Sequence, residues 1–471
     1  MNIIYFSHKI SIFAEYLHHT ITDPMELKIK KGLNLTLEGA VQQGITPLEV
    51  PVSLCAVVPD DFHGFIPKVE AKEGTEVAAG SPILFDKVHP EVKLVSPVAG
   101  RVKAVVRGER RKILRVEIEA ASTTAVQPRF SRPSNSAEAR SFLATSGLLA
   151  MFRQRPYDIV PSPNDSSVRD IFVTAFDCAP LASHEVSTGA LLFDSKDFEA
   201  GVAVLNLITE GKVYISRRAG TLSDIKGAEM IDVEGNYPAS NAGVQIAAVS
   251  PVNKGETVWT LDIVTLGRIG RLATTGVVDF TTVVALCGPE VEYPALLKTT
   301  VGASIAPLIE GRLKKTTKNL RVISGNVFTG TAVNPEDGFL HAPYRQITVI
   351  AEGDDVDEFM GWASLASNKM SESRTFPGHF FKRLFTPDAR LHGGRRAMIM
   401  SGQYDKVMPM DILTEYLVKA ILSHNIEDME KLGIYEVAPE DFAAAEYVDT
   451  SKLPLQQIVR DGLDYLRKEL E

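Results

Sequence analysis

The chain has 471 residues, more than one compact core accommodates, which predicts two to four domains. Its formal net charge is −9, and its strongest cationic block is the short run 107–112 (RGERRK), a balance that argues against a nucleic-acid partner. No apolar run approaches the roughly 20 residues of a membrane-spanning helix, so we expect the chain not to cross a bilayer.

Residues 1–24 combine aromatic and histidine side chains without the basic start and long apolar stretch of a signal peptide. We expect a disordered extension here, and both Met1 and Met25 are candidate starts. The neighbouring His18 and His19 could suggest a metal pair. Adjacent side chains point away from each other in a helix or a strand, so we interpret both as solvated surface.

Residues 25–125 are predicted to hold the first strands and a barrel-sandwich hybrid domain of the biotinyl or lipoyl type. Within it, the segment 64–106 alternates apolar positions between glycine and proline turns, which is typical of short hairpins. Lys87 lies at a predicted hairpin tip, where swinging-arm enzymes carry their modified lysine. Pro90 lengthens this tip and alters the strand pairing, so modification of Lys87 is kept only as an alternative.

Residues 126–276 follow a Ser- and Pro-rich boundary at 120–139 and predict a Rossmann-like α/β domain. Two strand-like runs, 171–175 and 212–215, flank the helix-like segment 197–210. This β–α–β pattern predicts a parallel sheet with crossover helices.

The phosphate-binding loop of a dinucleotide fold is missing from this region. Such a fold needs glycines directly after its first strand, and the sequence at that point is FDCAPLASHE. Gly267 and Gly270 form the nearest glycine pair, inside the apolar-periodic segment 257–274 and with no strand predicted before them. We interpret them as glycines that pack a helix.

The last two regions differ from the first two. Residues 277–352 predict a β-grasp, SLBB-like module, with the strand runs TTVVALCG and NLRVISGNVFTG on either side of a short helix within 295–309. Residues 353–471 predict a connecting segment and a helical domain. Its two apolar stripes are interpreted as core, and they comprise Leu413, Tyr416, Leu417, Ala420 and Ile421, then Leu455, Ile458, Leu463 and Leu466. The fold class is therefore α+β and multidomain.

Chemistry-bearing motifs assign no catalytic residue and no metal site. Cys55, Cys178 and Cys287 are far apart and form no CxxC pair, so we interpret them as buried small side chains. The sequence also contains no HExxH and no GxSxG motif. Independent enzymatic activity is not expected.

Placed in order, several segments resemble one family, the A subunit of the sodium-translocating NADH:quinone oxidoreductase, a bacterial respiratory complex. The resemblance runs from about Met25 to the C-terminus and rests on MELKIKKGLNL at Met25, SPVAGRV at Ser96, IFVTAFDCAPLA at Ile171, LITEGKVY at Leu207, YPASNAG at Tyr237, RVISGNVFTG at Arg321, RTFPGHFFK at Arg374 and YDKVMPMDIL at Tyr404. Eight segments in one order are far more specific than any single motif.

The resemblance implies a peripheral subunit on the cytoplasmic face of the bacterial inner membrane. Its partners would be five other subunits, chiefly the membrane-embedded ones. The whole complex would carry electrons from NADH through flavins and an iron–sulfur cluster to ubiquinone and export Na⁺. The chain itself would act as a non-catalytic or quinone-side subunit of this translocase.

The same resemblance implies that this chain binds no redox cofactor of its own. Related flavin and ferredoxin-linked subunits carry a cysteine-rich segment before a helix that starts with proline. Here 402–413 keeps Pro409 and has no cysteine, so an iron–sulfur cluster would lack thiolate ligands. The glycine-rich flavin loop also has no counterpart, so the α/β domain is expected to persist as scaffold.

Contact residues can be named as candidates only. Arg374, His379 and Lys382 combine cations with neighbouring phenylalanines, which suits a quinone headgroup or an acidic, apolar partner surface, and a structural loop is the alternative. Tyr237 with Pro238, and 241–243, could line a vestigial ligand pocket, although proline and glycine before an apolar helix are ordinary turn chemistry.

Two other functional classes remain open. One is a carrier protein with lipoate or biotin on Lys87, and the other is a stand-alone soluble NADH dehydrogenase. The sequence does not locate the quinone, the contacts with membrane subunits or the coupling to Na⁺.

Overall fold

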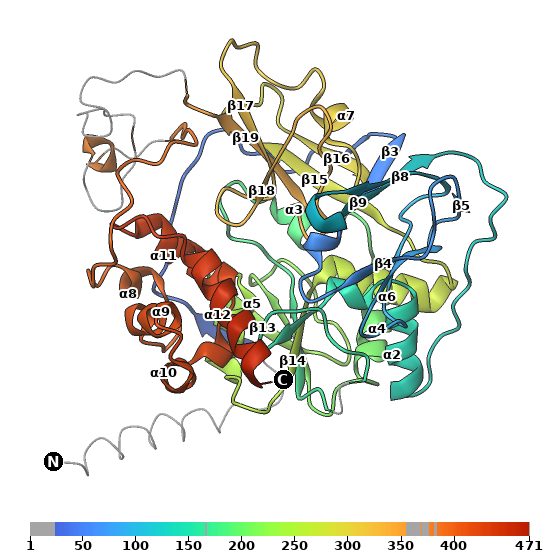
Figure 1. Ribbon diagram of the computed structural model, residues 1–471, viewed down its shortest axis with the longest axis horizontal. Coiled ribbons are helices and arrows are strands. Elements are labelled where there is room, and N and C mark those ends of the chain that lie inside the picture. Colours follow the sequence, from blue (N-terminus) through green and yellow to red (C-terminus); the bar gives the residue numbers. More distant parts are fainter. Residues whose placement is uncertain (1–23, 165–166, 355–368, 370–375, 381–383, 471) are drawn as a thin grey trace.

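The computed structural model describes residues 24–164, 167–354, 369, 376–380 and 384–470. Two six-stranded sheets, a barrel of two smaller sheets and a group of C-terminal helices make up this part of the chain. Figure 1 shows the C-terminal helices on one side of the molecule, the barrel strands on the other, and the six-stranded sheets between them. The extension predicted at 1–24 falls outside the described residues, apart from Pro24.

The first six-stranded sheet is parallel except at one edge. Its order is β1-β13-β12-β11-β14-β10, and β10 runs antiparallel to β14. The strands are β1 (Met25–Lys28), β10 (Arg153–Arg155), β11 (Asp170–Thr174), β12 (Val213–Arg217), β13 (Glu229–Glu234) and β14 (Val258–Asp262). The helices of this region are α2 (Ser136–Thr145), α3 (His184–Ser187), α4 (Ser195–Leu205), α5 (Ala242–Val249) and α6 (Ile263–Thr275), with the 3-10 turn η3 (Leu149–Met151).

The strand β11, in the interior of this sheet, is buried. Ile171, Phe172 and Val173 of β11 are all buried, as expected for a parallel sheet that helices cover on both faces. The predicted parallel β–α–β unit is confirmed by β11, α4 and β12. The wider assignment to a Rossmann-like fold stays a prediction.

Helices α4 and α6 pack closely because glycines line their contact. A Cβ atom at Gly270 would lie 1.7 Å from the carbonyl oxygen of Asp197, and one at Gly267 would lie 2.4 Å from the ring of Phe193. The interpretation of both as packing glycines is confirmed. The expectation that no strand precedes them is wrong, because β14 leads directly into α6. Strand and helix are both buried here, so apolar periodicity alone did not separate them.

The first strands of the chain do not lie in the barrel. β1 pairs in parallel with β13, and β2 (Leu48–Glu49) pairs in parallel with β16 (Ala295–Thr300) of the second six-stranded sheet. The region predicted at 25–125 therefore contributes to three sheet systems. Alternation along a strand shows which face is buried but does not specify its partner, so this placement was not visible in the sequence.

The barrel consists of the sheets β3-β9-β8-β5 and β4-β6-β7. Its elements are β3 (Leu54–Val57), β4 (Pro67–Val69), β5 (Glu76–Val77), β6 (Pro82–Asp86), β7 (Lys93–Val95), β8 (Gly100–Arg107) and β9 (Ile113–Ala120), with the 3-10 turns η1 (Pro59–Asp61) and η2 (Glu109–Arg111). Lys87 follows β6 and is exposed. Next to it, the buried carboxylate of Asp86 accepts the backbone N–H of Val88 at 2.7 Å and of His89 at 2.8 Å, so this tip is a fixed turn.

The second six-stranded sheet has the order β18-β17-β19-β15-β16-β2. Its further elements are β15 (Thr281–Cys287), β16 (Ala295–Thr300), β17 (Leu320–Ser324), β18 (Thr331–Val333), β19 (Gln346–Ala351) and α7 (Ile305–Ile309). The short helix predicted within 295–309 is confirmed by α7, but the strand β16, which pairs with β15 in the first half of this segment, was not predicted. Leu296 and Leu297 are both fully buried, so the run lacked the alternation that marks a half-exposed strand.

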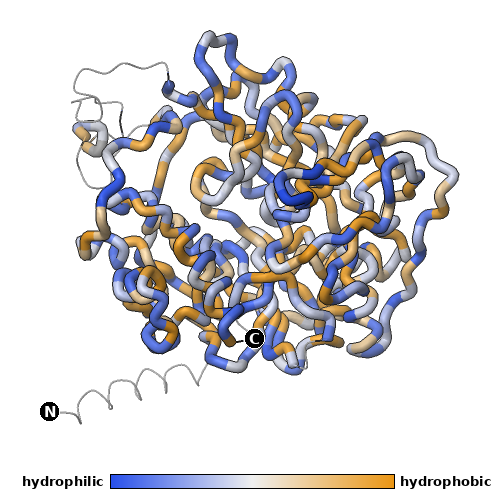
Figure 2. The backbone as a smooth tube through the Cα atoms, in the orientation of Figure 1, coloured by the Kyte–Doolittle hydropathy of each residue, from blue (hydrophilic) through white to orange (hydrophobic). Residues whose placement is uncertain are grey.

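The C-terminal region is helical, as predicted. It contains η5 (Pro377–Phe380), α8 (Tyr404–Val407), α9 (Thr414–Leu422), α10 (Ile426–Lys431), η6 (Ile434–Glu436), η7 (Pro439–Phe442), α11 (Ala443–Val448) and α12 (Leu455–Leu470). Gly462 of α12 lets Ile421 of α9 approach, since a Cβ there would lie 2.7 Å from Ile421 Cγ2. Figure 2 shows polar and apolar residues interspersed along the chain. None of the described helices is both long and apolar enough to cross a bilayer.

Candidate functional site

A cavity of about 460 Å³ opens at the carboxyl ends of β11 and β14. From β11 the chain proceeds through α4 to β12 on one side, whereas β14 lies on the other side of β11. Open α/β sheets bind their ligands at such a reversal of strand order. Thr174, Asp177 and Asp262 line the cavity from the two strand ends. We call it the junction cavity.

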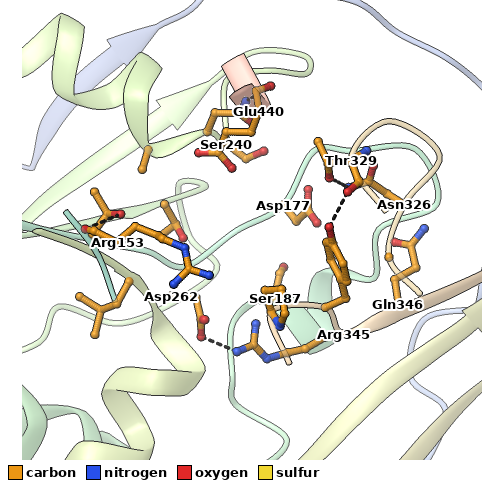
Figure 3. Close-up of a pocket in the computed structure, with 18 of the residues that line it drawn as sticks. Arg153, Asp177, Ser187, Ser240, Asp262, Asn326, Thr329, Arg345, Gln346 and Glu440 are labelled. Atoms are coloured by element: carbon orange, nitrogen blue, oxygen red, sulfur yellow. Dashed lines mark hydrogen bonds and ion pairs between the residues drawn. The ribbon is translucent and has the colours of Figure 1, made fainter. Parts of the chain in front are cut away.

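All four regions of the molecule contribute walls to the junction cavity. The barrel supplies Asp61 and Phe62, and the C-terminal region supplies Pro439, Glu440 and Gln456. The region of the second six-stranded sheet supplies the loop residues Gly325, Asn326, Thr329 and 342–345, and Gln346 at the start of β19. Figure 3 shows Asp262 with Arg345 at one end of the cavity and Ser240 with Glu440 at the other. A ligand bound here would contact several domains at once.

Asp262 ends β14 and caps the N-terminus of α6. Its Oδ1 accepts the backbone N–H of Thr265 at 2.8 Å and the Nη2 donor of Arg345 at 2.6 Å. Burial alone would raise the pKa of Asp262, but the charge and hydrogen bond of Arg345 outweigh it and lower that pKa. The carboxylate therefore stays ionised. It occupies the helix N-terminus, the position where a ligand phosphate binds in other α/β proteins.

The N-terminus of α5 is occupied in the same way, by a carboxylate from the C-terminal region. A Cβ at Gly243 would lie 2.3 Å from Oδ2 of Asp441, so this carboxylate packs against the first turn of α5. Asp441 is fully buried and accepts the Nη1 donor of Arg155 at 3.3 Å and the N–H of Ala438 at 2.9 Å. The positive ends of α5 and α6 thus both face carboxylates of this chain.

Two further carboxyl groups of the lining have raised pKa values. Asp177 is exposed to the cavity, yet the surrounding protein raises its pKa in spite of the N–H that Ala179 donates at 2.8 Å. Burial and the adjacent Asp441 raise the pKa of Glu440 to about 7, although Arg155 opposes this. The lining can therefore take up a proton close to neutral pH.

Asp61 and Arg153 hold three regions together at the cavity wall. Arg153 donates to the backbone carbonyls of Phe152 at 2.8 Å and of Asp61 at 2.5 Å. The Asp61 carboxylate accepts the N–H of Ala342 at 2.8 Å and is hydrogen-bonded to His341. Burial alone would lower the pKa of His341, but the hydrogen bond and charge of Asp61 raise it. A protonated His341 is therefore favoured in this contact.

The segment from Tyr237 onward lines the cavity opposite Arg345. Tyr237, Ser240, Asn241 and Ala242 line the cavity, whereas Pro238 and Gly243 are not among its lining residues. That this cavity is a vestigial ligand pocket stays a prediction. Ser240 also contacts Cys178, with 3.0 Å between its Oγ and the cysteine Sγ. Cys178 is partly exposed, unlike the buried Cys55 and Cys287, so the prediction of three buried cysteines is wrong for this one. Burial still raises the pKa of Cys178 to about 11.

The candidate contact residues of the sequence do not belong to this site. Arg374, Lys382 and the side chain of His379 lie outside the described residues. The site residues that sequence reasoning missed are carboxylates, above all Asp177 and Asp262. Asp262 ends β14 and Asp177 lies three residues after the end of β11, and these positions could have marked both residues once β14 was recognised.

Comparison with known proteins finds matches along nearly the whole chain. The family descriptions "NqrA N-terminal barrel-sandwich hybrid domain", "NqrA second alpha/beta domain" and "NQRA C-terminal domain" match residues 27–121, 134–278 and 283–334. The A subunit of the Na(+)-translocating NADH-quinone reductase of Serratia proteamaculans is 36% identical over 456 residues, which cover 94% of this chain and 100% of that protein. The chain belongs to the NqrA family.

Other NqrA proteins match as well. Those of Yersinia pseudotuberculosis and Hahella chejuensis are 34% identical over 453 residues and 37% identical over 461 residues, again with 94% of this chain and 100% of the relative covered. The predicted family is therefore confirmed, together with its barrel-sandwich and SLBB-like domains. Among solved structures, an NAD+-reducing [NiFe]-hydrogenase covers 48% of this chain and 52% of its own at 12% identity, with a TM-score of 0.32 that is too low to establish a shared fold.

Proposed function

We propose that this NqrA protein is a peripheral, cofactor-free subunit of a Na⁺-translocating NADH:ubiquinone oxidoreductase. It would bind at the cytoplasmic face of the bacterial inner membrane, contact five other subunits and support the quinone-reducing half of the reaction and the assembly of the complex. The names of the relatives, each the A subunit of a Na⁺-translocating NADH-quinone reductase, support membership in such a complex. The complex, and not this chain, would use NADH, flavins, an iron–sulfur cluster and ubiquinone.

One observation carries the cofactor-free part of the proposal. At the switch point of the sheet, two helix N-termini that could attract a phosphate are occupied by carboxylates of the chain, Asp262 at α6 and Asp441 at α5. A phosphate there would meet carboxylates, and like charges at close range repel. The alternative, displacement of Asp441, would deprive the buried Arg155 of its buried partner and leave it only the partly exposed Glu440, at 3.1 Å.

The loop after β11 supports the same conclusion. Close approach of a diphosphate requires glycines, whereas Phe176, Asp177 and Cys178 follow the strand here. Asp177 adds a carboxyl group where a phosphate would have to lie. The site therefore retains the location of a nucleotide site without the groups that hold a nucleotide.

Affinity isolation from native membranes tests the role in the complex. A tag on this chain should bring down five further subunits, and the chain released from them should be colourless. Recovery of the chain alone from the cytosolic fraction, with nothing bound to it in the membrane fraction, would contradict the proposal. In that case the alternative of a stand-alone NADH dehydrogenase is tested by calorimetry, which should then show that the isolated chain binds NADH.

The carrier alternative rests on the exposed position of Lys87 at the turn between β6 and β7. Intact mass spectrometry of the chain from a host that lipoylates and biotinylates its proteins decides this point. The unmodified mass is expected. A mass increase that Lys87→Arg abolishes would establish the carrier function instead.

A further inference from the structure

A second cavity, of about 480 Å³, lies in the C-terminal region. Its walls are 327–328 from the second six-stranded sheet, the segment 390–396, and residues on and after α11. We call it the C-terminal cavity. Gln456 lines this cavity and the junction cavity alike, and its Nε2 donates to the carbonyl oxygen of Phe328 at 3.0 Å.

Cations outnumber carboxylates in the lining of the C-terminal cavity. Four Arg and Lys side chains and two carboxylates line it, in a chain whose net charge is −9. Arg390 pairs with Asp388 at 2.5 Å. For Arg395, Arg396 and Lys452, the described part of the chain supplies no side-chain hydrogen bond and no ion pair.

The two carboxylates of the lining are already engaged elsewhere. Asp449 accepts the Tyr404 hydroxyl at 2.9 Å and the N–H of Leu453 at 2.7 Å, and it is fully buried. Glu446 accepts the N–H of Gln456 at 2.8 Å. Neither carboxylate forms an ion pair with the three cations within the described ranges, so the cluster keeps a net positive charge toward the cavity.

Backbone contacts hold the segment of Arg395 and Arg396 beside the segment of Lys452. The N–H of Arg396 donates to the carbonyl oxygen of Ser451 at 2.9 Å, and the Ser451 hydroxyl donates to that of Ala397 at 3.0 Å. These two bonds hold the Arg396 segment against the residue before Lys452. A Cβ on Gly393 would lie 3.7 Å from Cε of Lys452, which places this side chain against the same segment. Burial lowers the pKa of Lys452 in spite of the negative charge nearby, and a bound anion would relieve that cost.

Aromatic rings form the other part of the wall. Phe328 and Tyr447 meet edge to face with ring centroids 5.8 Å apart, and Phe376 meets His392 in the same way at 5.7 Å. All four side chains line the cavity. A flat or apolar group can therefore pack beside the cationic cluster.

We propose that the C-terminal cavity binds an organic phosphate, with its phosphate group contacted by Arg395, Arg396 and Lys452. Guanidinium groups match the geometry of phosphate oxygens and bind them with charge-assisted hydrogen bonds, and lysine adds a point charge. The apolar part of the ligand packs on Phe328, Phe376 and Tyr447. This site shares only Gln456 with the lining of the junction cavity, and it does not depend on the role proposed for the chain in the complex.

Calorimetry on the full chain with phenyl phosphate and inorganic phosphate tests the proposal. Phenyl phosphate should bind more tightly than inorganic phosphate, because its ring reaches the aromatic wall. Arg395→Gln with Arg396→Gln should weaken binding by roughly tenfold or more, as expected from the loss of charge-assisted hydrogen bonds. Lys452→Gln should weaken it too. Both arginines are exposed, so circular dichroism should show a folded variant.

The matched control is Arg110→Gln with Arg111→Gln, an adjacent exposed arginine pair on the barrel that changes the net charge by the same amount. This control should leave binding unchanged. Equal weakening by both double variants would reveal a general charge effect and overturn the proposal, as would the absence of binding by every probe, vesicles included.

Vesicles distinguish the two sources of such a phosphate. Cosedimentation with vesicles of phosphatidylglycerol and phosphatidylcholine, lost in the Arg395→Gln/Arg396→Gln variant and absent with phosphatidylcholine alone, would identify a lipid headgroup as the ligand. Binding of phenyl phosphate without vesicle binding would identify a soluble organic phosphate.

Discussion

The junction cavity and the C-terminal cavity are of similar volume, but they treat charge in opposite ways. In the junction cavity several carboxylates have cationic partners within the chain, such as Arg345 for Asp262 and His341 for Asp61, and Asp177 accepts the N–H of Ala179. In the C-terminal cavity Arg395, Arg396 and Lys452 have none in the described part of the chain. A cavity whose charges neutralise one another is complete without an ionic ligand. One with unneutralised cations gains free energy when an anion binds.

Removal of Arg155 should produce the largest effect on the junction side. Arg155→Met leaves the fully buried Asp441 without its ion-pair partner, and Arg155 itself is only 1% exposed. We expect the free energy of unfolding to fall by about 3–5 kcal/mol, as for other broken buried pairs. Urea denaturation followed by circular dichroism measures this loss.

Two controls bracket that measurement. Lys112→Met removes an exposed ion pair with Asp60 and should cost less than about 1 kcal/mol. Adding Asp441→Asn to Arg155→Met should recover part of the loss, because the uncompensated charge is gone. A cost for Arg155→Met no larger than that for Lys112→Met would show that the pair does not hold η7 against the sheet.

Substitution of Asp262 should leave an unpaired cation in the junction cavity, as in the C-terminal cavity. Asp262→Ser keeps a capping oxygen for α6 but leaves Arg345 unpaired, so we expect a loss of about 1–3 kcal/mol. Phosphate should then raise the melting temperature of this variant. The comparison is made in the Arg395→Gln/Arg396→Gln background, which removes the contribution of the C-terminal cavity. No gain from phosphate there would mean that Asp262 is not what excludes an anion.

The smallest expected effects are on the pH dependence of stability. The pKa of Glu440 is raised from 4.5 to about 7 in the folded state, so folding favours its protonated form. Its contribution to stability is present at low pH and decreases as the pH rises from 4.5 through about 7. Glu440→Gln should flatten the unfolding free energy over this window, and an unchanged slope would contradict the assignment.

His341 should affect stability over the next higher pH range, and in the same direction as Glu440. Its pKa is raised above 6.5 by Asp61, so its stabilising contribution is complete below 6.5 and is lost as the pH rises through the folded-state pKa. His341→Asn should remove that loss while leaving the slope assigned to Glu440 in place. Denaturant unfolding of both variants, measured from pH 4 to 9 in steps of about half a pH unit, separates the contribution of Glu440 from that of His341.

Much of the fold could be predicted because it depends on local patterns. The turns of the barrel, the β–α–β unit around α4 and the stripe of α12 all follow from periodicity and turn residues. The parts that failed are buried on all sides. β14 and β16 lack alternation because Trp259, Leu261, Leu296 and Leu297 are all buried, so periodicity could not distinguish strand from helix there.

The junction site could be predicted only in part, for a related reason. Tyr237 and Asn241 were noticed because a distinctive turn precedes an apolar helix. The carboxylates that define the site come from distant segments, and Asp441 lies about 200 positions from Gly243, which it contacts. Such a contact depends on how the C-terminal region packs against the sheet, which no local pattern encodes.

The visible absorption spectrum of the chain released from its affinity-purified complex tests the central claim most directly. If the chain's own carboxylates occupy the nucleotide positions of the junction cavity, the wild-type chain and the Arg395→Gln/Arg396→Gln variant should both be colourless. A stoichiometric flavin or iron–sulfur chromophore that persists in this variant would contradict the account.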